Sequence, residues 1–342
     1  MSDAARTARP DDSLHGVRNR RGDWQPRQPL QPAPVFVFPP RPLAFLKWLP
    51  HYLLPWNALF FSTTVVFWLW LTPSAATLKT LAPGWVLYLL ARNMIAVALF
   101  YGAFELTLYV RRRQGTQFKY NGRWPSEQPG KAFLFGSQTL DNVIRTFAFG
   151  LPIWTAYEVL ILWCWANGWG PWTTFAAHPV WLVVLTLLIP VIHEVHFYCI
   201  HRLIHVPVLY RLVHSVHHNC VNPSPWSSLS MHPVEHVLYW SGALLHLLVP
   251  SHPLIALYQI YHAGFGAVVG HIGFDRIVVG DRAIDTHTYA HYLHHKYFEV
   301  NYADGLIPLD RMFGTLHDGS DAAQEAMNRR FFARTAQKRG AA

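Results

Sequence analysis

The segment FYCIHRLIHVPVLYRLVHSVHHN, residues 197–219, contains five histidines within eighteen positions and follows a stretch apolar enough to lie in a bilayer. His201 and His205 are four residues apart, and His214 is followed three and four residues later by His217 and His218. In a helix, these spacings place side chains on one face. The segment therefore predicts helices that present imidazoles in clusters at the edge of a membrane.

A later segment, HYLHH at 291–295, repeats the second pattern with His291, His294 and His295. A single histidine on an apolar helix is usually a hydrogen-bonded core residue, but three such clusters in one chain favour metal binding. One first-row ion takes roughly four to six donors, so eight histidines imply two ions held close together. Neutral imidazole suits iron, copper, nickel and zinc, and the ligand type alone does not select the metal.

Composition supports a membrane protein, because 51% of the 342 residues are hydrophobic and only 14% are charged. Apolar runs reach or approach the roughly 20 residues that cross a hydrocarbon core. We expect four spans, at 56–71, 84–110, 143–165 and 179–200. A fifth apolar region, 237–270, is broken by VPSHP at 249–253 and is interpreted as a re-entrant hairpin. The predicted fold is an all-α integral membrane bundle with a cytoplasmic helical cap that carries the histidines.

The remaining sequence divides the chain further. Residues 1–47 are basic and rich in proline and lack an apolar signal segment, which predicts a disordered tail. Residues 48–142 are expected to hold the first transmembrane hairpin and a polar loop, 143–318 the catalytic region, and 319–342 a basic C-terminal tail.

The charge distribution predicts the orientation in the membrane. The net charge of +9 is concentrated in the tails and in RRRQG at 111–115, which indicates one membrane face beside anionic lipid rather than a nucleic-acid surface. Arg111 to Arg113 follow the second expected span, whereas the turn at 166–178 has no lysine or arginine. All histidine clusters then face the cytoplasm. Three isolated cysteines offer neither a disulfide framework nor a thiolate metal site.

The position of the histidine clusters beside apolar helices limits the reactions that a bound metal could catalyse. Zinc has no redox chemistry, and a hydrolase needs only one ion with an open position or a carboxylate-bridged pair. A histidine-lined site served by apolar helices suits oxidation of an acyl chain or a sterol by dioxygen. No P-loop, flavin motif or haem-binding cysteine pair is present in the sequence, so the electrons are expected from a separate protein.

The ordered motifs HRLIH, HSVHH, MHPVE at 231–235, GHIGFD at 270–275, HYLHH and LDRMFGT ending at Thr315 resemble the fatty acid hydroxylase/sterol desaturase superfamily. The resemblance runs from about residue 143 to residue 318. It implies an integral membrane non-haem di-iron enzyme that hydroxylates or desaturates a lipid with dioxygen and external electrons. It further implies that the eight clustered histidines are iron ligands, together with the isolated His271 and His232 of the HPVE element.

Several details stay open at this point. Glu194 and Asp275 are candidates for orienting ligand imidazoles from behind, because Glu194 is seven residues before His201 and Asp275 four after His271. HPVE and LDRMFGT look more like sterol-acting relatives, which favours a sterol or a sterol-like substrate, as in a C-5 sterol desaturase. The alternatives are a fatty acyl or sphingolipid hydroxylase of the same superfamily, or a non-enzymatic membrane carrier of haem or metal.

Overall fold

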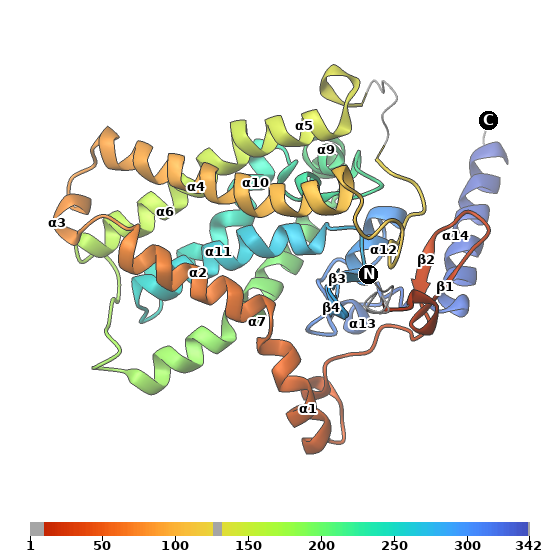
Figure 1. Ribbon diagram of the computed structural model, residues 1–342, viewed down its shortest axis with the longest axis horizontal. Coiled ribbons are helices and arrows are strands. Elements are labelled where there is room, and N and C mark those ends of the chain that lie inside the picture. Colours follow the sequence, from red (N-terminus) through yellow and green to blue (C-terminus); the bar gives the residue numbers. More distant parts are fainter. Residues whose placement is uncertain (1–9, 126–131, 341–342) are drawn as a thin grey trace, which may run out of the picture.

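A computed structural model describes residues 10–125 and 132–340, with the backbone alone described for 334–340. Those residues are mostly helical, with two short two-stranded sheets, which confirms the predicted fold class. Helices α2, α4, α6, α7 and α11 lie side by side in an elongated bundle (Figure 1). Short elements that include β3, β4, α9, α12 and α13 gather at one end of the bundle and form the cap.

Three continuous helices are long and apolar enough to cross a membrane. They are α4 (Pro83–Phe104) with its π-helical extension η3 (Glu105–Val110), α5 (Gln138–Arg145) continued through η5 (Thr146–Gly150) into α6 (Leu151–Ala166), and α7 (Pro179–Ile204). A fourth passage is broken, because α1 (Pro42–Leu53) and α2 (Trp56–Trp70) meet at a bend of 42°. The protein is therefore a membrane protein with three unbroken candidate spans, and the expected first span is the second half of a bent pair.

The bend leaves α1 outside the bundle (Figure 1). Its side chains Leu43 and Leu46 are 73% and 60% exposed although the helix is apolar. Leu54 ends α1 and Pro55 caps α2, and a proline cannot donate the backbone hydrogen bond that would continue the first helix. An apolar helix exposed beside a membrane bundle is typical of a segment that lies at the lipid interface.

The apolar region after residue 232 forms a deep helical hairpin. It consists of α10 (Pro233–Trp240), the 3-10 helix η8 (Ser241–Leu247) and α11 (Pro253–Gly270). With rises of about 1.5 Å and 2.0 Å per residue, the first arm is about 26 Å long and α11 about 27 Å. The tip pairs with the turn between α6 and α7, where Thr173 N donates to Ser251 O at 2.9 Å and Trp181 Nε1 to Pro250 O at 2.6 Å. The hairpin thus reaches the far end of the bundle.

Helix α11 is the central element, since most of its side chains are buried and it packs against α2, α6 and α7. A polar network ties its neighbours together inside the apolar interior. Arg92 of α4 pairs with Glu158 of α6, and Tyr261 of α11 donates to the same carboxylate at 2.8 Å. A charge removed from water must be paired and hydrogen-bonded, and this network meets that requirement.

The cap contains the segments that carry the histidines. It includes α8 (Pro207–Leu209), the π-helix η6 (Tyr210–His214), α9 (Ser215–His218), η7 (Pro225–Leu229), the antiparallel pair β3 (Arg276–Val279) and β4 (Arg282–Asp285), α12 (Tyr289–Tyr297) and α13 (Leu309–Met312). The C-terminal helix α14 (Asp321–Gly340) extends beside it (Figure 1). The short α3 (Ala75–Leu78) and η4 (Leu134–Gly136) complete the connections.

The prediction of disorder is wrong for residues 10–47, whereas residues 1–9 lie outside the described part. The chain forms η1 (Asp12–Leu14), an antiparallel pair of β1 (Gly16–Arg18) and β2 (Trp24–Pro26), and η2 (Pro34–Phe36). Trp24 is 2% exposed and packs against Phe118 and Tyr120 of the polar loop. Its backbone N–H donates to Tyr120 O at 3.0 Å. The buried side chain of Trp24 thus anchors an N-terminal segment whose overall composition is polar.

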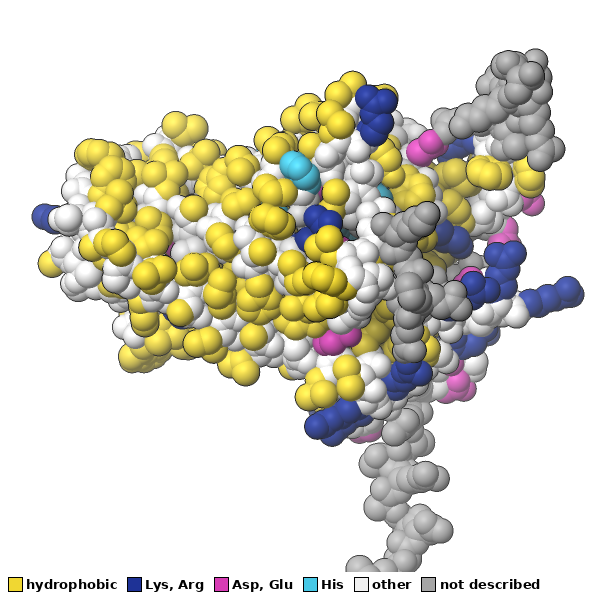
Figure 2. All heavy atoms as spheres, turned by 90° about the horizontal axis from the view of Figure 1, so that it is seen from above, with side chains coloured by type: hydrophobic (Ala, Val, Ile, Leu, Met, Phe, Trp, Pro, Cys, Tyr) yellow, Lys and Arg dark blue, Asp and Glu magenta, His cyan; other side chains and the backbone are white. Residues whose placement is uncertain are grey.

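The surface divides along the length of the molecule. Figure 2 shows hydrophobic side chains over most of the bundle, with Lys, Arg, Asp and Glu gathered towards the cap. Exposed leucine, isoleucine and valine side chains occur along the spans, such as Ile95, Leu99 and Val180 at 61%, 70% and 75%. A soluble protein rarely exposes so continuous an apolar surface, so this face fits contact with lipid.

Candidate metal centre

Nine histidines converge in two groups at the junction of the bundle and the cap. Centre A consists of His201, His205, His214, His218 and His294, and centre B of His217, His271, His291 and His295. Within each group, one ring nitrogen per histidine lies within 4.8 Å of the corresponding atoms of all the others. Each group therefore offers the four or five nitrogen donors that a first-row metal ion takes.

The helical spacing distributes the ligands between the centres in a regular way. Residues four apart share a centre, as His214 and His218 do in centre A and His291 and His295 in centre B. The histidine three residues after the first member crosses to the other centre, as His217 and His294 do. Because positions three and four apart differ by about 100° around a helix, α9 and α12 each insert between the centres and supply both.

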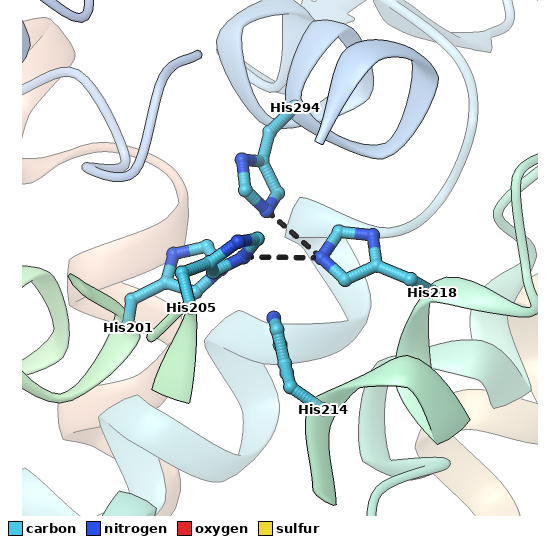
Figure 3. Close-up of side chains that lie close together, drawn as sticks. All are labelled: His201, His205, His214, His218 and His294. Atoms are coloured by element: carbon cyan, nitrogen blue, oxygen red, sulfur yellow. Dashed lines mark hydrogen bonds between the residues drawn. The ribbon is translucent and has the colours of Figure 1, made fainter. Parts of the chain in front are cut away.

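Centre A has the compactness of a coordination sphere. Figure 3 shows its five imidazoles pointing toward one another from α7, the η6–α9 segment and α12. The Nε2 atom of His218 is 3.3 Å from Nε2 of His205 and 3.1 Å from Nε2 of His294. Two ligands bound at about 2.1 Å to one ion stand roughly 3.0 to 3.4 Å apart, which agrees with these distances.

Centre B is tighter and more deeply buried. The Nε2 atoms of His271, His291 and His295 form a triangle with sides of 2.9, 3.1 and 3.2 Å, and Nε2 of His217 is 3.1 Å from Nε2 of His271. All four side chains are at most 5% exposed. In a neutral imidazole, each Nε2 either carries the ring hydrogen and donates or lacks it and accepts. Three mutually close Nε2 atoms therefore cannot all be paired with one another by hydrogen bonds.

The hydrogen bonds of the Nδ1 atoms show which ring nitrogen carries the hydrogen in three of the histidines. Nδ1 of His201, His271 and His294 stands 2.7 to 2.8 Å from the carbonyl oxygens of Tyr302, Ala267 and Val300 respectively. A carbonyl only accepts, so each Nδ1 carries the hydrogen and each Nε2 directs a lone pair into its centre. Nε2 of His214 is buried there without a hydrogen-bond partner. Converging lone pairs that lack protons fit a cation between them, so the residues present suit a metal ion in each centre.

Burial keeps these imidazoles neutral. Desolvation, with repulsion from neighbouring imidazoles, lowers the pKa of His217, His218, His294 and His295 well below the ordinary value of histidine. Desolvation also lowers the pKa of His271 to about 4. A metal ligand must be deprotonated, and these groups meet that condition at neutral pH without competition from protons.

Local structure explains how His271 reaches centre B. It caps the C-terminus of α11, and the chain turns sharply at Gly273, whose φ of +74° is rarely adopted by other residues. The single hydroxyl hydrogen of Tyr109 is shared between Ile272 O at 2.8 Å and Pro223 O at 2.9 Å, and a Cβ at Gly273 would stand 2.5 Å from that hydroxyl oxygen. The GHIGFD motif is thus a helix end that only a glycine allows at this place.

A second motif supports centre A through the backbone. Asp310 of LDRMFGT is buried and accepts the backbone N–H groups of Tyr302 and Ala303 at 2.9 and 2.8 Å and the hydroxyl of Thr315 at 2.6 Å. The loop that it holds presents Tyr302 O to Nδ1 of His201. Asp310 is therefore a positioning residue for a ligand that it does not touch.

A large cavity borders centre B and part of centre A. Its volume is about 940 Å³, within the range of ligand-binding pockets. It extends from the metal centres between α1, α2, α7 and α11 and is closed on another side by residues 26–34 of the N-terminal segment. The histidines on its wall that belong to the two centres are His201, His214, His217, His271 and His291.

Three of the residues that the sequence singled out lie elsewhere. His232 is outside both groups, and its Nδ1 caps α10 by accepting the N–H of Val234 at 3.2 Å. The carboxylate of Glu194 accepts the backbone N–H groups of Gly305 and Ile307 at 3.0 Å. Asp275 accepts from Tyr120 Oη at 3.0 Å. Asp275 also pairs with Arg276 of β3 at 3.5 Å, so the described partners of the two acids are not ligand imidazoles.

The acid that does contact a ligand is Glu235. Its Oε1 accepts from Nδ1 of His214 at 2.8 Å, and its side chain is buried against centre A. Sequence reasoning recognised Glu235 only as part of the HPVE element and gave it no role. Its position on the first turn of α10 could have been noticed, but its contact with a histidine 21 residues earlier is a tertiary feature.

Comparison with known proteins agrees with this geometry. Residues 185–315, which include all nine histidines of the two centres, match the model of the family described as fatty acid hydroxylase. This part of the chain belongs to the fatty acid hydroxylase/sterol desaturase superfamily. The resemblance read from the motifs is thereby confirmed. The matched segment begins in α7 and ends just after α13, so it comprises the cap and the hairpin below it.

The similar curated proteins are named as sterol enzymes. A Delta(7)-sterol 5(6)-desaturase of Gibberella zeae is 30% identical over 141 residues, covering 40% of this chain and 42% of that protein. A Delta(7)-sterol 5(6)-desaturase of Saccharomyces cerevisiae is 31% identical over 126 residues, 36% and 34% of the two chains. Methylsterol monooxygenase 1 of Gallus gallus is 28% identical over 149 residues, 40% and 48%. The chain thus spans less than half of these relatives, and no solved structure matches it.

Proposed function

We propose that this protein is a membrane-bound non-haem di-iron oxidoreductase that desaturates or hydroxylates a sterol or a sterol-like lipid with dioxygen. The observation that carries the proposal is the pair of all-histidine centres on the wall of a cavity of about 940 Å³ inside an apolar bundle. The sterol preference is supported by the names of the relatives, which are desaturases and a monooxygenase of sterols. His232 is left out of the proposed ligand set, which consists of the nine histidines of centres A and B.

The side chains prepare the site in three ways. Buried neutral imidazoles supply the donors, and carbonyl groups behind His201, His271 and His294 fix the orientation of the rings. The apolar helices around the cavity admit a lipid and exclude bulk water, which protects a reaction at an unactivated C–H bond. When bound, a pair of iron ions supplies the one-electron chemistry that dioxygen requires.

The balance of the reaction requires an external partner. In hydroxylation, two electrons and two protons join dioxygen and the lipid, and one oxygen atom enters the product while the other leaves as water. In desaturation, two hydrogens of the lipid and the same two electrons and protons reduce dioxygen to two waters. The sequence contains no motif for a flavin or a dinucleotide, which supports a separate electron-donor protein.

The experiment that tests the function compares lipid extracts from cells with and without the chain by mass spectrometry. A product heavier by one oxygen atom indicates hydroxylation, and one lighter by two hydrogens indicates desaturation. A variant with His217 and His218 both replaced by Ala is the matched control, because it should remain in the membrane without the product. If the iron-loaded protein and a reductant consume no dioxygen on any sterol, acyl lipid or ceramide, the proposal fails.

Two other functions are distinguishable in the same material. A fatty acyl or sphingolipid hydroxylase is favoured by the description of the matching family, and its product would be an acyl lipid. A membrane carrier of haem would show a strong Soret band, and a metal transporter would place ligands near the bilayer midplane. The centres lie at the end of the bundle, where α7 passes into the cap, which disfavours the transporter (Figure 1).

We further propose that the cap faces the cytoplasm, as the arginines at 111–113 and the uncharged turn at 166–178 suggest. In a background with the exposed Cys199 replaced by Ser, a cysteine at Ala176 should react with an impermeant maleimide on intact cells. A cysteine at Asp281, in the turn between β3 and β4, should react only after permeabilisation. The opposite labelling pattern would place the cap outside.

A further inference from the structure

His193 is a polar side chain on the cavity wall that no metal centre uses. It lies on α7, is 8% exposed and borders the cavity. The rings of His262, Tyr239 and Phe197 surround it at centroid distances of 5.2, 5.9 and 6.1 Å. It makes no hydrogen bond to any described residue and belongs to neither histidine group. Its ring nitrogens are not enclosed by the protein and are open to the cavity, so they can bind a partner that comes from outside the chain.

Most polar atoms around His193 have a hydrogen-bond partner, with Nδ1 of His262 as the exception. Asn57 donates its amide to Tyr52 O at 2.6 Å, which directs its Oδ1 to Nε2 of His262 at 3.0 Å. Tyr239 donates its hydroxyl to Ala263 O at 2.8 Å. His196, one turn of chain away, pairs with the hydroxyl of Ser241 at 2.9 Å and is not on the cavity wall. Unused hydrogen-bonding capacity at this end of the cavity therefore belongs to His193 and to Nδ1 of the neighbouring His262.

The charge of the wall limits the chemistry of the partner. The described cavity residues from α1, α2, α7 and α11 include neither lysine nor arginine. The neighbouring Glu194 directs its carboxylate to the backbone at 305 and 307. A phosphate or a carboxylate head would find no cation here and would have an acid nearby. A neutral imidazole both donates and accepts one hydrogen bond, which matches a hydroxyl group.

The position of His193 relates this polar point to the metal centres. It precedes His201 by eight residues on α7, a rise of about 12 Å. Phe197 lies between them and packs against His193, His201 and His291 at 6.1, 4.8 and 6.2 Å. A ligand that contacts both ends therefore passes the ring of Phe197. A hydrogen bond at His193 would set how deep such a ligand enters and which carbon lies next to centre B.

We propose that His193 binds the hydroxyl group of a neutral sterol and thereby positions the sterol for oxidation at the metal centres. This inference rests on the proposed function for the reaction, but the binding itself requires no turnover. His193 acts as a positioning residue, since it touches the substrate at a distance from the reacting carbon.

The test measures equilibrium binding of tritiated cholesterol, and of the matched sterol hydrocarbon that lacks the hydroxyl, to the purified full chain in nanodiscs. The wild type should prefer cholesterol by about three- to tenfold, the value of one hydrogen bond. His193→Leu should abolish the preference, and His193→Gln should restore part of it because glutamine also donates and accepts. His196→Leu, the matched control on the same helix, should keep the wild-type ratio. Metal content should be unchanged in all three variants.

The inference is overturned if the wild type binds neither lipid or binds both equally, or if His196→Leu loses the preference as His193→Leu does. Loss of metal in both His193 variants would instead make His193 part of the metal site and would also overturn it. A preference that depends on His193 in a protein that oxidises no lipid would support the binding site and remove the proposed function. Oxidation of a sterol by a protein that shows no binding preference for cholesterol would support the proposed function and overturn the binding site at His193.

Discussion

Centre A and centre B contain the same kind of ligand but differ in how the protein holds them. In centre A, carbonyl or carboxylate groups fix Nδ1 of His201, His214 and His294. In centre B, only His271 is held in this way, and Nδ1 of His217, His291 and His295 has no partner in the described structure. His205 makes centre A partly exposed, whereas every ligand of centre B is buried. Centre A thus has more hydrogen bonds behind its imidazoles and one partly exposed member, whereas centre B is enclosed except where it borders the cavity.

The partition of the ligands gives the largest expected effect. His217 and His218 are adjacent in sequence but belong to different centres. Replacing both with Ala should damage both centres and leave almost no bound iron. Replacing His217 and His295, which share centre B, should leave about one ion per chain, because centre A stays complete. Iron analysis of the purified variants decides between these outcomes.

The control for the two double variants is His246, which belongs to neither histidine group. Its Nδ1 lies 2.7 Å from Ser251 Oγ and its Nε2 lies 2.8 Å from Gln259 Oε1. His246→Gln should retain both ions because its role is a hydrogen bond inside the hairpin. If the two double variants lose the same amount of iron, the division into two centres is wrong.

Acid should destabilise the metal-free protein through its buried histidines. The pKa of His271 is lowered by burial from 6.5 to about 4. The unfolded chain then binds more protons below pH 6.5, so the stability is complete above that pH and falls as the pH drops toward 4. This one group accounts for about 3 kcal/mol, at about 1.4 kcal/mol per unit of pKa shift.

The measurement is the melting temperature of chelator-treated protein between pH 7 and pH 4. The variant His271→Gln should show a shallower decline than the wild type. The matched variant His287→Gln should not, because His287 is 62% exposed in the turn after β4. Equal slopes for the two variants would show that centre B does not carry this penalty.

The support behind centre A gives a smaller and more selective effect. Loss of an acid that orients a ligand imidazole typically costs about 10- to 100-fold in metal affinity. Glu235→Ala should therefore weaken one ion per chain and leave the other, since the contact of Glu235 is with His214 of centre A. Glu235→Gln, which still accepts from Nδ1, should lie closer to the wild type. Competition with a graded chelator would resolve the two affinities, and equal weakening of both ions would contradict the assignment.

The sequence predicted the bundle because long apolar runs have few alternatives to spanning helices in lipid. Prediction from the sequence was less successful where a single tertiary contact, rather than the local composition, determines whether a segment is ordered or a side chain is buried. Trp24 orders a polar, proline-rich segment, and Lys119 of the polar loop is fully buried with its ammonium donating to Asn121 O and Arg123 O. Burial lowers the pKa of this lysine to about 7. Such contacts join residues that are far apart in the chain, so no local sequence pattern predicts them.

The sequence predicted ten histidine ligands, and the structure brings nine of them together in the two groups and leaves His232 outside. The histidine spacings of three and four follow from the helical period, and the motif order identified the superfamily. How the histidines divide between the two groups became clear only from the fold, in which the angle of about 100° between adjacent helical positions directs His217 and His218 to different centres. It also decided that Glu235, rather than Glu194 or Asp275, contacts a ligand, since that contact depends on how α10 packs against η6.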